Sequence, residues 1–127
     1  MQITTLDHLV LTVEDIAATC EFYHRVLGFE VITFDGNRKS LRFGDQKINL
    51  HRAGAEFQPC AGRPTAGSAD LCFITDMPIE TVIEHFKQCD IVIEAGPVAR
   101  TGARGPIRSV YIRDPDDNLL ELSNYTR

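Results

Sequence analysis

The stretch His8-Leu9-Val10-Leu11-Thr12 returns later in the chain as Asp70-Leu71-Cys72-Phe73-Ile74-Thr75, and this repetition decides the fold. Both stretches combine β-branched, aromatic and aliphatic residues, which predicts a strand. Each is followed by apolar residues at helical spacing and then by further strand-like stretches. The chain therefore contains two copies of one structural unit.

Helix boundaries support the repeat. In the first copy, Asp15 can cap a helix and Gly28 stands where that helix should end. In the second copy, Asp76 can cap a helix and Pro78 suits its first turn. Both copies thus predict one helix directly after the first strand.

Three strand-like stretches follow each predicted helix. They cover residues 29–34, 40–43 and 47–51 in the first copy, and 91–93, 109–112 and 118–122 in the second. We therefore expect an α+β fold of two β-α-β-β-β modules, with curved, mostly antiparallel sheets and the helices outside. A single domain, residues 1–127, would hold module one at about 3–52, a Gly- and Pro-rich linker at about 53–68 and module two at about 69–125.

Composition narrows the class of protein. The 127 residues are 43% hydrophobic and 24% charged, which is typical of a globular domain, and the net charge of −5 argues against nucleic-acid binding. No stretch indicates a signal peptide or a membrane span. The four cysteines form no C-x-x-C pair, so free thiols and a cytoplasmic location are expected.

Four ionisable residues stand on predicted strands among apolar neighbours: His8, His51, Asp70 and Glu121. The repeat places His8 opposite Asp70 and His51 opposite Glu121, and strand alternation points all four away from the helix-packed face. Unrelated solvated residues are one interpretation. Convergence on one divalent ion (Zn²⁺, Ni²⁺, Mn²⁺ or Fe²⁺) is the other, because a metal offsets the cost of burying such groups.

The sequence resembles the vicinal oxygen chelate superfamily, and its glyoxalase-like members in particular. The resemblance covers nearly the whole chain. It lies in residues 8–16, in Phe22-Tyr23, in Leu27-Gly28-Phe29 and in residues 113–122, which are close to the family's Asp-Pro-Asp-Gly-Asn-aliphatic-aliphatic-Glu signature. Residues 67–72 and 100–107 resemble the glyoxalase domain-containing protein 5 subgroup.

The resemblance implies metal ligands at the first and last strand of each module, which matches His8, His51, Asp70 and Glu121. It implies a glyoxalase-type lyase or isomerase in which Glu121 is both ligand and proton carrier and a small oxygen-bearing substrate chelates the metal. An extradiol-type dioxygenase and a non-catalytic binding or resistance protein are the alternatives. The histidine and carboxylate at His51 and Asp70 are exchanged relative to glyoxalase I.

Further residues are candidates for contact with a small-molecule substrate. Arg100 and Arg104, with Arg108, lie in a Gly- and Pro-rich segment that we expect to form a loop. One interpretation is that its guanidinium groups hold an anionic substrate; the other is an ordinary solvated loop. Tyr111 and Arg113 share a strand face with Ser109 and could line the cavity. Family resemblance also implies a homodimer.

Overall fold

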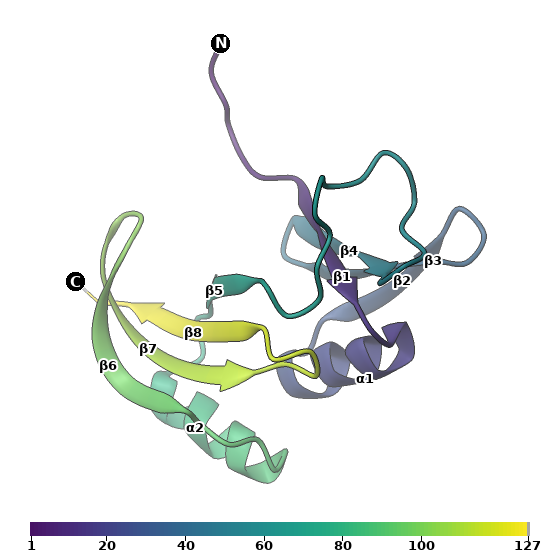
Figure 1. Cartoon of the computed structure of the whole chain (residues 1–127). Coiled ribbons are helices and arrows are strands. Elements are labelled where there is room, and N and C mark those ends of the chain that lie inside the picture. The colour runs from purple at the N-terminus through teal and green to yellow at the C-terminus, as the bar shows by residue number, and fades with distance from the viewer. Residues whose placement is uncertain (127) are drawn as a thin grey trace. The chain divides into compact units, whose positions relative to one another are not determined.

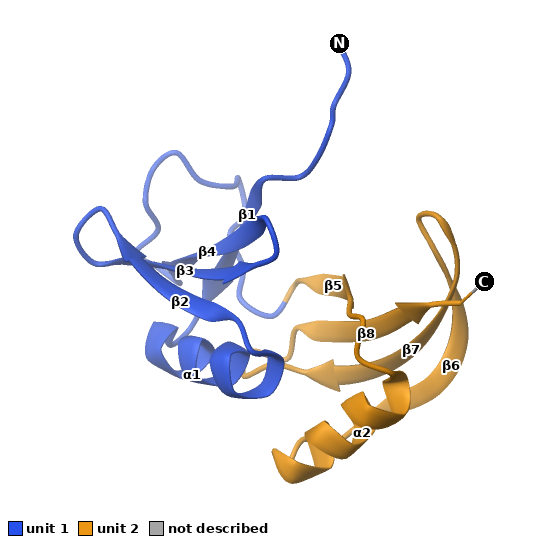
Figure 2. Ribbon diagram, turned by 180° about the vertical axis from the view of Figure 1, so that it is seen from behind, with its two compact units in different colours: residues 1–67 blue, residues 68–127 orange. Residues whose placement is uncertain are grey.

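A computed structural model describes residues 1–126, and the chain divides into two compact units, residues 1–67 and 68–127 (Figure 2). Each unit contains one helix and one four-stranded mixed sheet, which confirms the expected α+β class and the β-α-β-β-β order (Figure 1). Within the described residues, no helix is long and apolar enough to cross a membrane.

The first unit has its strands in the spatial order β1-β4-β3-β2. Its elements are β1 (His8–Val13), α1 (Ile16–Leu27), β2 (Glu30–Phe34), β3 (Arg38–Phe43) and β4 (Gln46–Arg52). β1 pairs with β4 in parallel, and the other neighbours are antiparallel. Residues 53–67, between β4 and β5, contain no helix or strand.

The second unit repeats this arrangement with the order β5-β8-β7-β6. Its elements are β5 (Asp70–Ile74), α2 (Ile79–Gln88), β6 (Ala95–Gly102), β7 (Gly105–Arg113) and β8 (Leu119–Tyr125). Again the first and last strands of the unit, β5 and β8, pair in parallel, and the others are antiparallel.

Each helix covers one face of its own sheet, and that face forms the core. In the first unit, α1 contributes the buried Tyr23 and Val26 against sheet residues that include Leu50 and Ile48. In the second, Phe86 of α2 packs on the sheet that contains Leu120. Burial of such side chains contributes about 1.5–3 kcal/mol each. The opposite face of each sheet is therefore left for other groups.

The two helices begin differently. Asp15 caps α1 as expected, because its Oδ1 accepts a hydrogen bond from the Ala18 backbone N–H at 3.0 Å. The cap predicted at Asp76 is wrong: Pro78 precedes α2, and Asn124 from β8 accepts the hydrogen bond of the Ile79 N–H at 2.8 Å. A residue far along the chain thus replaces the local cap.

The segment after α2 also differs from expectation. Residues 91–93, predicted as a strand, are irregular, and the strand begins instead at Ala95. β6 and β7 form a hairpin, so Arg100 lies on a strand and Arg104 in the turn rather than both in a loop. The Gly- and Pro-rich composition was misleading because Pro97 lies on an edge strand, where a missing N–H is tolerated.

Candidate functional site

Two carboxylates share the helix-free face of the second sheet. Asp70 lies opposite Leu119 and Cys72 lies opposite Glu121 in the parallel pairing of β5 with β8. Because side chains alternate along a strand, Asp70 and Glu121 point to the same side and are diagonal neighbours, about 8 Å apart at Cα from the usual strand spacing and rise. Neither forms an ion pair within the described part of the chain.

Hydroxyl groups fix the orientation of Glu121. The Ser109 Oγ donates to Glu121 Oε2 at 2.6 Å, and Ser109 Oγ lies 2.7 Å from Ser123 Oγ. Ser123 is in turn 3.4 Å from the Cys72 Sγ. Both serines are fully buried, so the contact between their hydroxyls is shielded from water, and Ser109 holds one oxygen of Glu121 in place.

The pKa of the Cys72 thiol reflects the negative charge on this face. Partial burial raises its pKa, and the negative charges of Glu121 and Asp70 raise it further, whereas a hydrogen bond with Ser123 lowers it. Both carboxylates therefore act on one intervening side chain. A face that carries two carboxylates favours a cation.

A turn anchors the start of β5 beside β8. The Asn118 side chain is buried, accepts a hydrogen bond from the Ala69 N–H at 2.8 Å and donates one to Asp114 Oδ2 at 2.8 Å. Asp114 Oδ1 also accepts from the Asn118 N–H at 3.0 Å. Asn118 thereby ties the residue before Asp70 to the strand that carries Glu121.

The first unit does not bring its two predicted ligands together. His8 lies opposite Lys47, and His51 lies opposite Thr12. The two histidines share a face but are four positions apart, or about 13 Å at about 3.3 Å per residue. His8 is half exposed, with its Nδ1 2.8 Å from Asp7 Oδ2, whereas His51 is only 3% exposed.

The strand registers correct the repeat that the sequence indicates. In the second unit, Glu121 lies opposite Cys72, which is two residues after Asp70. In the first unit, the residue two places after His8 is Val10, and the residue opposite it is Asn49. His51 corresponds instead to Ser123. The error is two residues, which keeps the same face, so alternation could not reveal it.

Asn49 is the residue that sequence reasoning missed. It is 7% exposed, and its Oδ1 has no hydrogen-bond partner within the described chain. Its diagonal relation to His8 is the same as that of Glu121 to Asp70. The available signal was a polar residue between Ile48 and Leu50, which face the helix. Each unit thus presents one diagonal pair of possible metal donors.

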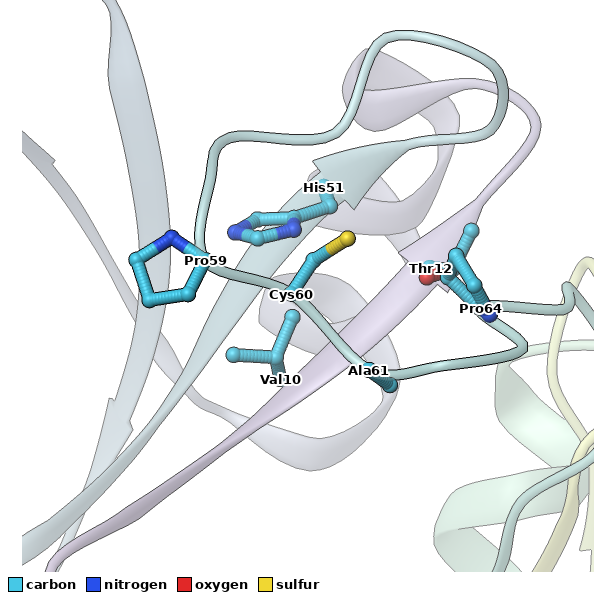
Figure 3. A pocket seen from close by; sticks show the side chains of 7 residues that line it. All are labelled: Val10, Thr12, His51, Pro59, Cys60, Ala61 and Pro64. Carbon is cyan, nitrogen blue, oxygen red and sulfur yellow. The ribbon is translucent and has the colours of Figure 1, made fainter.

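His51 lies in a pocket of the first unit, against β1 and the segment that follows β4 (Figure 3). Its ring meets the Phe57 ring edge-on at a centroid distance of 5.5 Å. Burial lowers the pKa of His51, the Arg38 charge lowers it further, and Glu56 opposes both. Burial and Arg38 therefore favour the neutral form of the imidazole.

No three His, Cys, Asp or Glu side chains of residues 1–126 gather closely enough to hold a metal ion. The possible donors come as the two pairs described above, one in each unit. The pair in the first unit is an imidazole and an amide oxygen, and the pair in the second unit is two carboxylates; all are donor groups that divalent ions of the first transition series accept.

Comparison with known proteins places this architecture in a family. The model of the Glyoxalase/Bleomycin resistance protein/Dioxygenase superfamily matches residues 5–122. The chain belongs to this superfamily. It is 60% identical over 125 residues to Virulence protein STM3117 of Salmonella typhimurium, covering 98% of this chain and 87% of that protein. The crystal structure of STM3117 has a TM-score of 0.98, and the match covers 99% of this chain and 100% of that one.

Two further relatives extend the comparison. The Glyoxalase domain-containing protein RDO1 of Mycosarcoma maydis is 50% identical over 125 residues, covering 98% of this chain and 70% of that protein. A variant of the fosfomycin resistance protein FosX of Listeria monocytogenes, complexed with Mn(II), is 22% identical with a TM-score of 0.65. That match covers 95% of this chain and 90% of the FosX chain and shows a shared fold.

One departure from the superfamily's closing signature lies at Asp117, where the pattern has glycine. Asp117 has a φ of 67°, in the left-handed region that favours glycine. Aspartate tolerates this region better than most residues. The turn is therefore kept, and Asp114 Oδ1 still accepts the Asp116 N–H at 2.9 Å.

The four residues predicted to contact substrate have different surroundings. Tyr111 lies opposite Glu121, so it shares the carboxylate face, and its hydroxyl accepts a hydrogen bond from Arg100 Nε at 3.0 Å. Arg104 lies over the Tyr125 ring at 4.2 Å. Arg113, on the same strand face as Tyr111, donates two hydrogen bonds to the Glu94 carboxylate, at 2.9 and 3.0 Å.

Proposed function

We propose that this protein is a metal-dependent lyase or isomerase of the glyoxalase type, acting on a small substrate whose adjacent oxygens chelate one divalent ion. His8, Asp70 and Glu121 would hold the ion, and Asn49 would supply a fourth oxygen. The observation that carries the proposal is that Asp70 and Glu121 lie on one sheet face, and that neither forms an ion pair within residues 1–126.

The donor set fits a borderline or hard divalent ion. One imidazole and two carboxylates, with an amide oxygen, suit Mn²⁺, Fe²⁺, Ni²⁺ or Zn²⁺. His51 is not part of this set, because its position along β4 separates it from His8. When bound, such an ion would supply Lewis acidity that stabilises negative charge on the substrate oxygens. The FosX variant with Mn(II) supports this choice by its fold.

Glu121 would move the proton. Ser109 holds its Oε2, which leaves Oε1 to take a proton from one substrate carbon and return it to the neighbouring carbon. The buried serines keep the carboxylate oriented, so less reorganisation is needed during the transfer. The same carboxylate therefore serves both half-reactions, as an isomerisation between adjacent carbons requires.

Tyr111 and Arg100 would bind the substrate. Tyr111 is the cross-strand neighbour of Glu121, and Arg100 orients its hydroxyl while keeping an exposed positive charge. A guanidinium at this place favours a substrate with a carboxylate or another anionic group. Arg104 would contribute a second charge from the hairpin turn. Arg113 is held by Glu94 and would act by shaping the strand end.

We also propose that the chain forms a homodimer in the cytoplasm. Membership of the superfamily supports a dimer, and the four cysteines, all free, support a reducing compartment. Light scattering after size-exclusion chromatography would measure the mass directly, and a mass near 14.2 kDa would contradict the dimer.

Metal binding is the first test. Purified protein is stripped with EDTA and titrated with MnCl₂, NiCl₂ and ZnSO₄ by calorimetry. Glu121→Gln should weaken the tightest metal at least tenfold, because an anionic ligand becomes neutral, whereas Glu84→Gln, on the exposed part of α2, should not. His51→Phe should leave the metal affinity unchanged. Loss of binding in the His51 variant would contradict the ligand set.

Turnover is the second test. The reconstituted protein is assayed with methylglyoxal and glutathione, and separately with catechol under air. Product from the first mixture that disappears in Glu121→Gln but not in Glu84→Gln supports the proposal. Ring cleavage of catechol would favour a dioxygenase instead. Tight metal binding without turnover of either mixture would favour a binding or resistance protein.

A further inference from the structure

The pocket around His51 belongs to the first unit alone and contains none of the residues assigned to the metal. Its volume is about 480 Å³, within the usual range of about 300–1,000 Å³ for small-ligand sites. Most of its lining is apolar: Val10, Pro59, Ala61 and Pro64. Figure 3 shows these side chains on two sides of the His51 ring, from β1 and from the segment after β4.

One polar atom in this pocket is unsatisfied. His51 is buried, with only 3% of its surface exposed, and its Nε2 has no hydrogen-bond partner within the described chain. Buried polar atoms are nearly always hydrogen-bonded, and an orphan one costs about 1–3 kcal/mol. Strand pairing fixes the His51 backbone, and the imidazole meets the Phe57 ring edge-on.

From this geometry we infer that the pocket is a binding site for a small apolar alcohol or phenol whose hydroxyl forms a hydrogen bond with His51 Nε2. The inference goes beyond the proposed enzyme activity and does not depend on a metal.

A hydroxyl can form a hydrogen bond with His51 Nε2 whether or not that nitrogen carries a hydrogen. If Nε2 carries a hydrogen it needs an acceptor, and if it does not it needs a donor. A carbonyl or an ether oxygen satisfies only the first case, whereas a hydroxyl satisfies both. Thr12, also at the pocket, provides a further hydroxyl beside His51 in the strand register.

The rest of the ligand should be apolar and preferably flat. Two prolines, an alanine and a valine offer no hydrogen bonds, and contact with them removes apolar surface from water. The His51 imidazole adds an aromatic ring to the lining, which favours a ring in the ligand. Phenol is the smallest aromatic compound that has both a flat apolar ring and a hydroxyl.

Phenol, benzene and benzoate test the inference on the EDTA-treated full chain, by chemical shifts in ¹H–¹⁵N spectra. Phenol should bind, and His51→Phe should weaken it about three- to tenfold, the ratio expected for one hydrogen bond. Benzene affinity should change less than twofold in that variant. Ala61→Trp should abolish binding of both, because the indole fills the cavity.

A second measurement locates the ligand. The Cys60 thiol lines the pocket, so phenol should slow its alkylation by iodoacetamide, while Cys20 on α1 should react at an unchanged rate. This measurement also serves if His51→Phe does not fold, because it uses the unsubstituted chain and Ala61→Trp.

Three results would overturn the inference: no phenol binding, tighter binding of benzoate than of phenol, or equal phenol affinity in the folded His51→Phe variant. Phenol binding should be the same in Glu121→Gln, so failure of the proposed metal chemistry would leave this result untouched.

Discussion

Replacement of Asn118 by alanine tests how the second unit places Asp70. The substitution removes the hydrogen bond from the Ala69 N–H and the one to the Asp114 carboxylate, both at 2.8 Å. A neutral hydrogen bond contributes about 1 kcal/mol and one to a charged group about 1.5–3 kcal/mol, so the loss should be about 3 kcal/mol. The Ala69 N–H would also lack its side-chain partner at the start of β5.

Urea unfolding followed by circular dichroism measures this loss. With a slope of about 1.5 kcal/mol per molar urea, the midpoint should fall by about 2 M. Asn37→Ala is the matched control, because Asn37 is exposed in the turn before β3, and its midpoint should move by less than about 0.3 M. Equal midpoints for the two variants would refute the anchoring role of Asn118.

A consequence for the metal separates anchoring from plain stability. Under conditions where Asn118→Ala remains folded, it should bind the metal more weakly than the wild type, because the start of β5 is no longer fixed beside Glu121. Asp70→Asn should give a larger loss of affinity without the loss of stability. Unchanged metal affinity in folded Asn118→Ala would show that the turn serves folding alone.

Three further predictions concern titrating groups. The pKa of His51 is lowered in the folded state, so the unfolded chain takes up the proton first as the pH falls. The free energy of unfolding should therefore fall as the pH drops below about 6.5. In His51→Gln, the urea midpoint should depend less on pH in that range. Glu121→Gln should lower the pKa of Cys72 and speed its alkylation at pH 8, as peptide mass spectrometry would show, whereas an unchanged rate would contradict their proximity. Hydrogen bonds from Arg113 lower the pKa of Glu94, so Arg113→Gln should raise that pKa; an NMR titration that finds no rise would disprove the pairing.

The fold could be predicted because its signals are local and occur twice. The strand at His8 and the strand at Asp70 share composition, and the helix cap at Asp15 depends on a neighbour three residues away. The cap of α2 could not be predicted, since its acceptor, Asn124, is 45 residues from Ile79. Hydrogen bonds between distant segments leave no pattern in a single sequence.

The candidate site was predicted as a face and not as a set of positions. Alternation correctly assigned Asp70 and Glu121 to the face away from the helix, because their neighbours Leu120 and Leu122 are buried on the other one. Alternation has a period of two, so it cannot distinguish His51 from Asn49, which share a face. Only the pairing of β1 with β4 removes the ambiguity.

This two-residue correction changes the chemistry expected of the first unit. With His51 as ligand, the ion would have two imidazoles and two carboxylates. With Asn49 instead, as we propose, it would have one imidazole, one neutral amide and two carboxylates, a harder and more oxygen-rich set that would shift the preference toward Mn²⁺ or Fe²⁺. His51 is then not a proposed ligand, and its buried Nε2, which has no hydrogen-bond partner within residues 1–126, needs another explanation. The pairing of β1 with β4 thus underlies both proposals: a metal site that includes His8 and Asn49, and an apolar site at His51, two residues after Asn49 on β4.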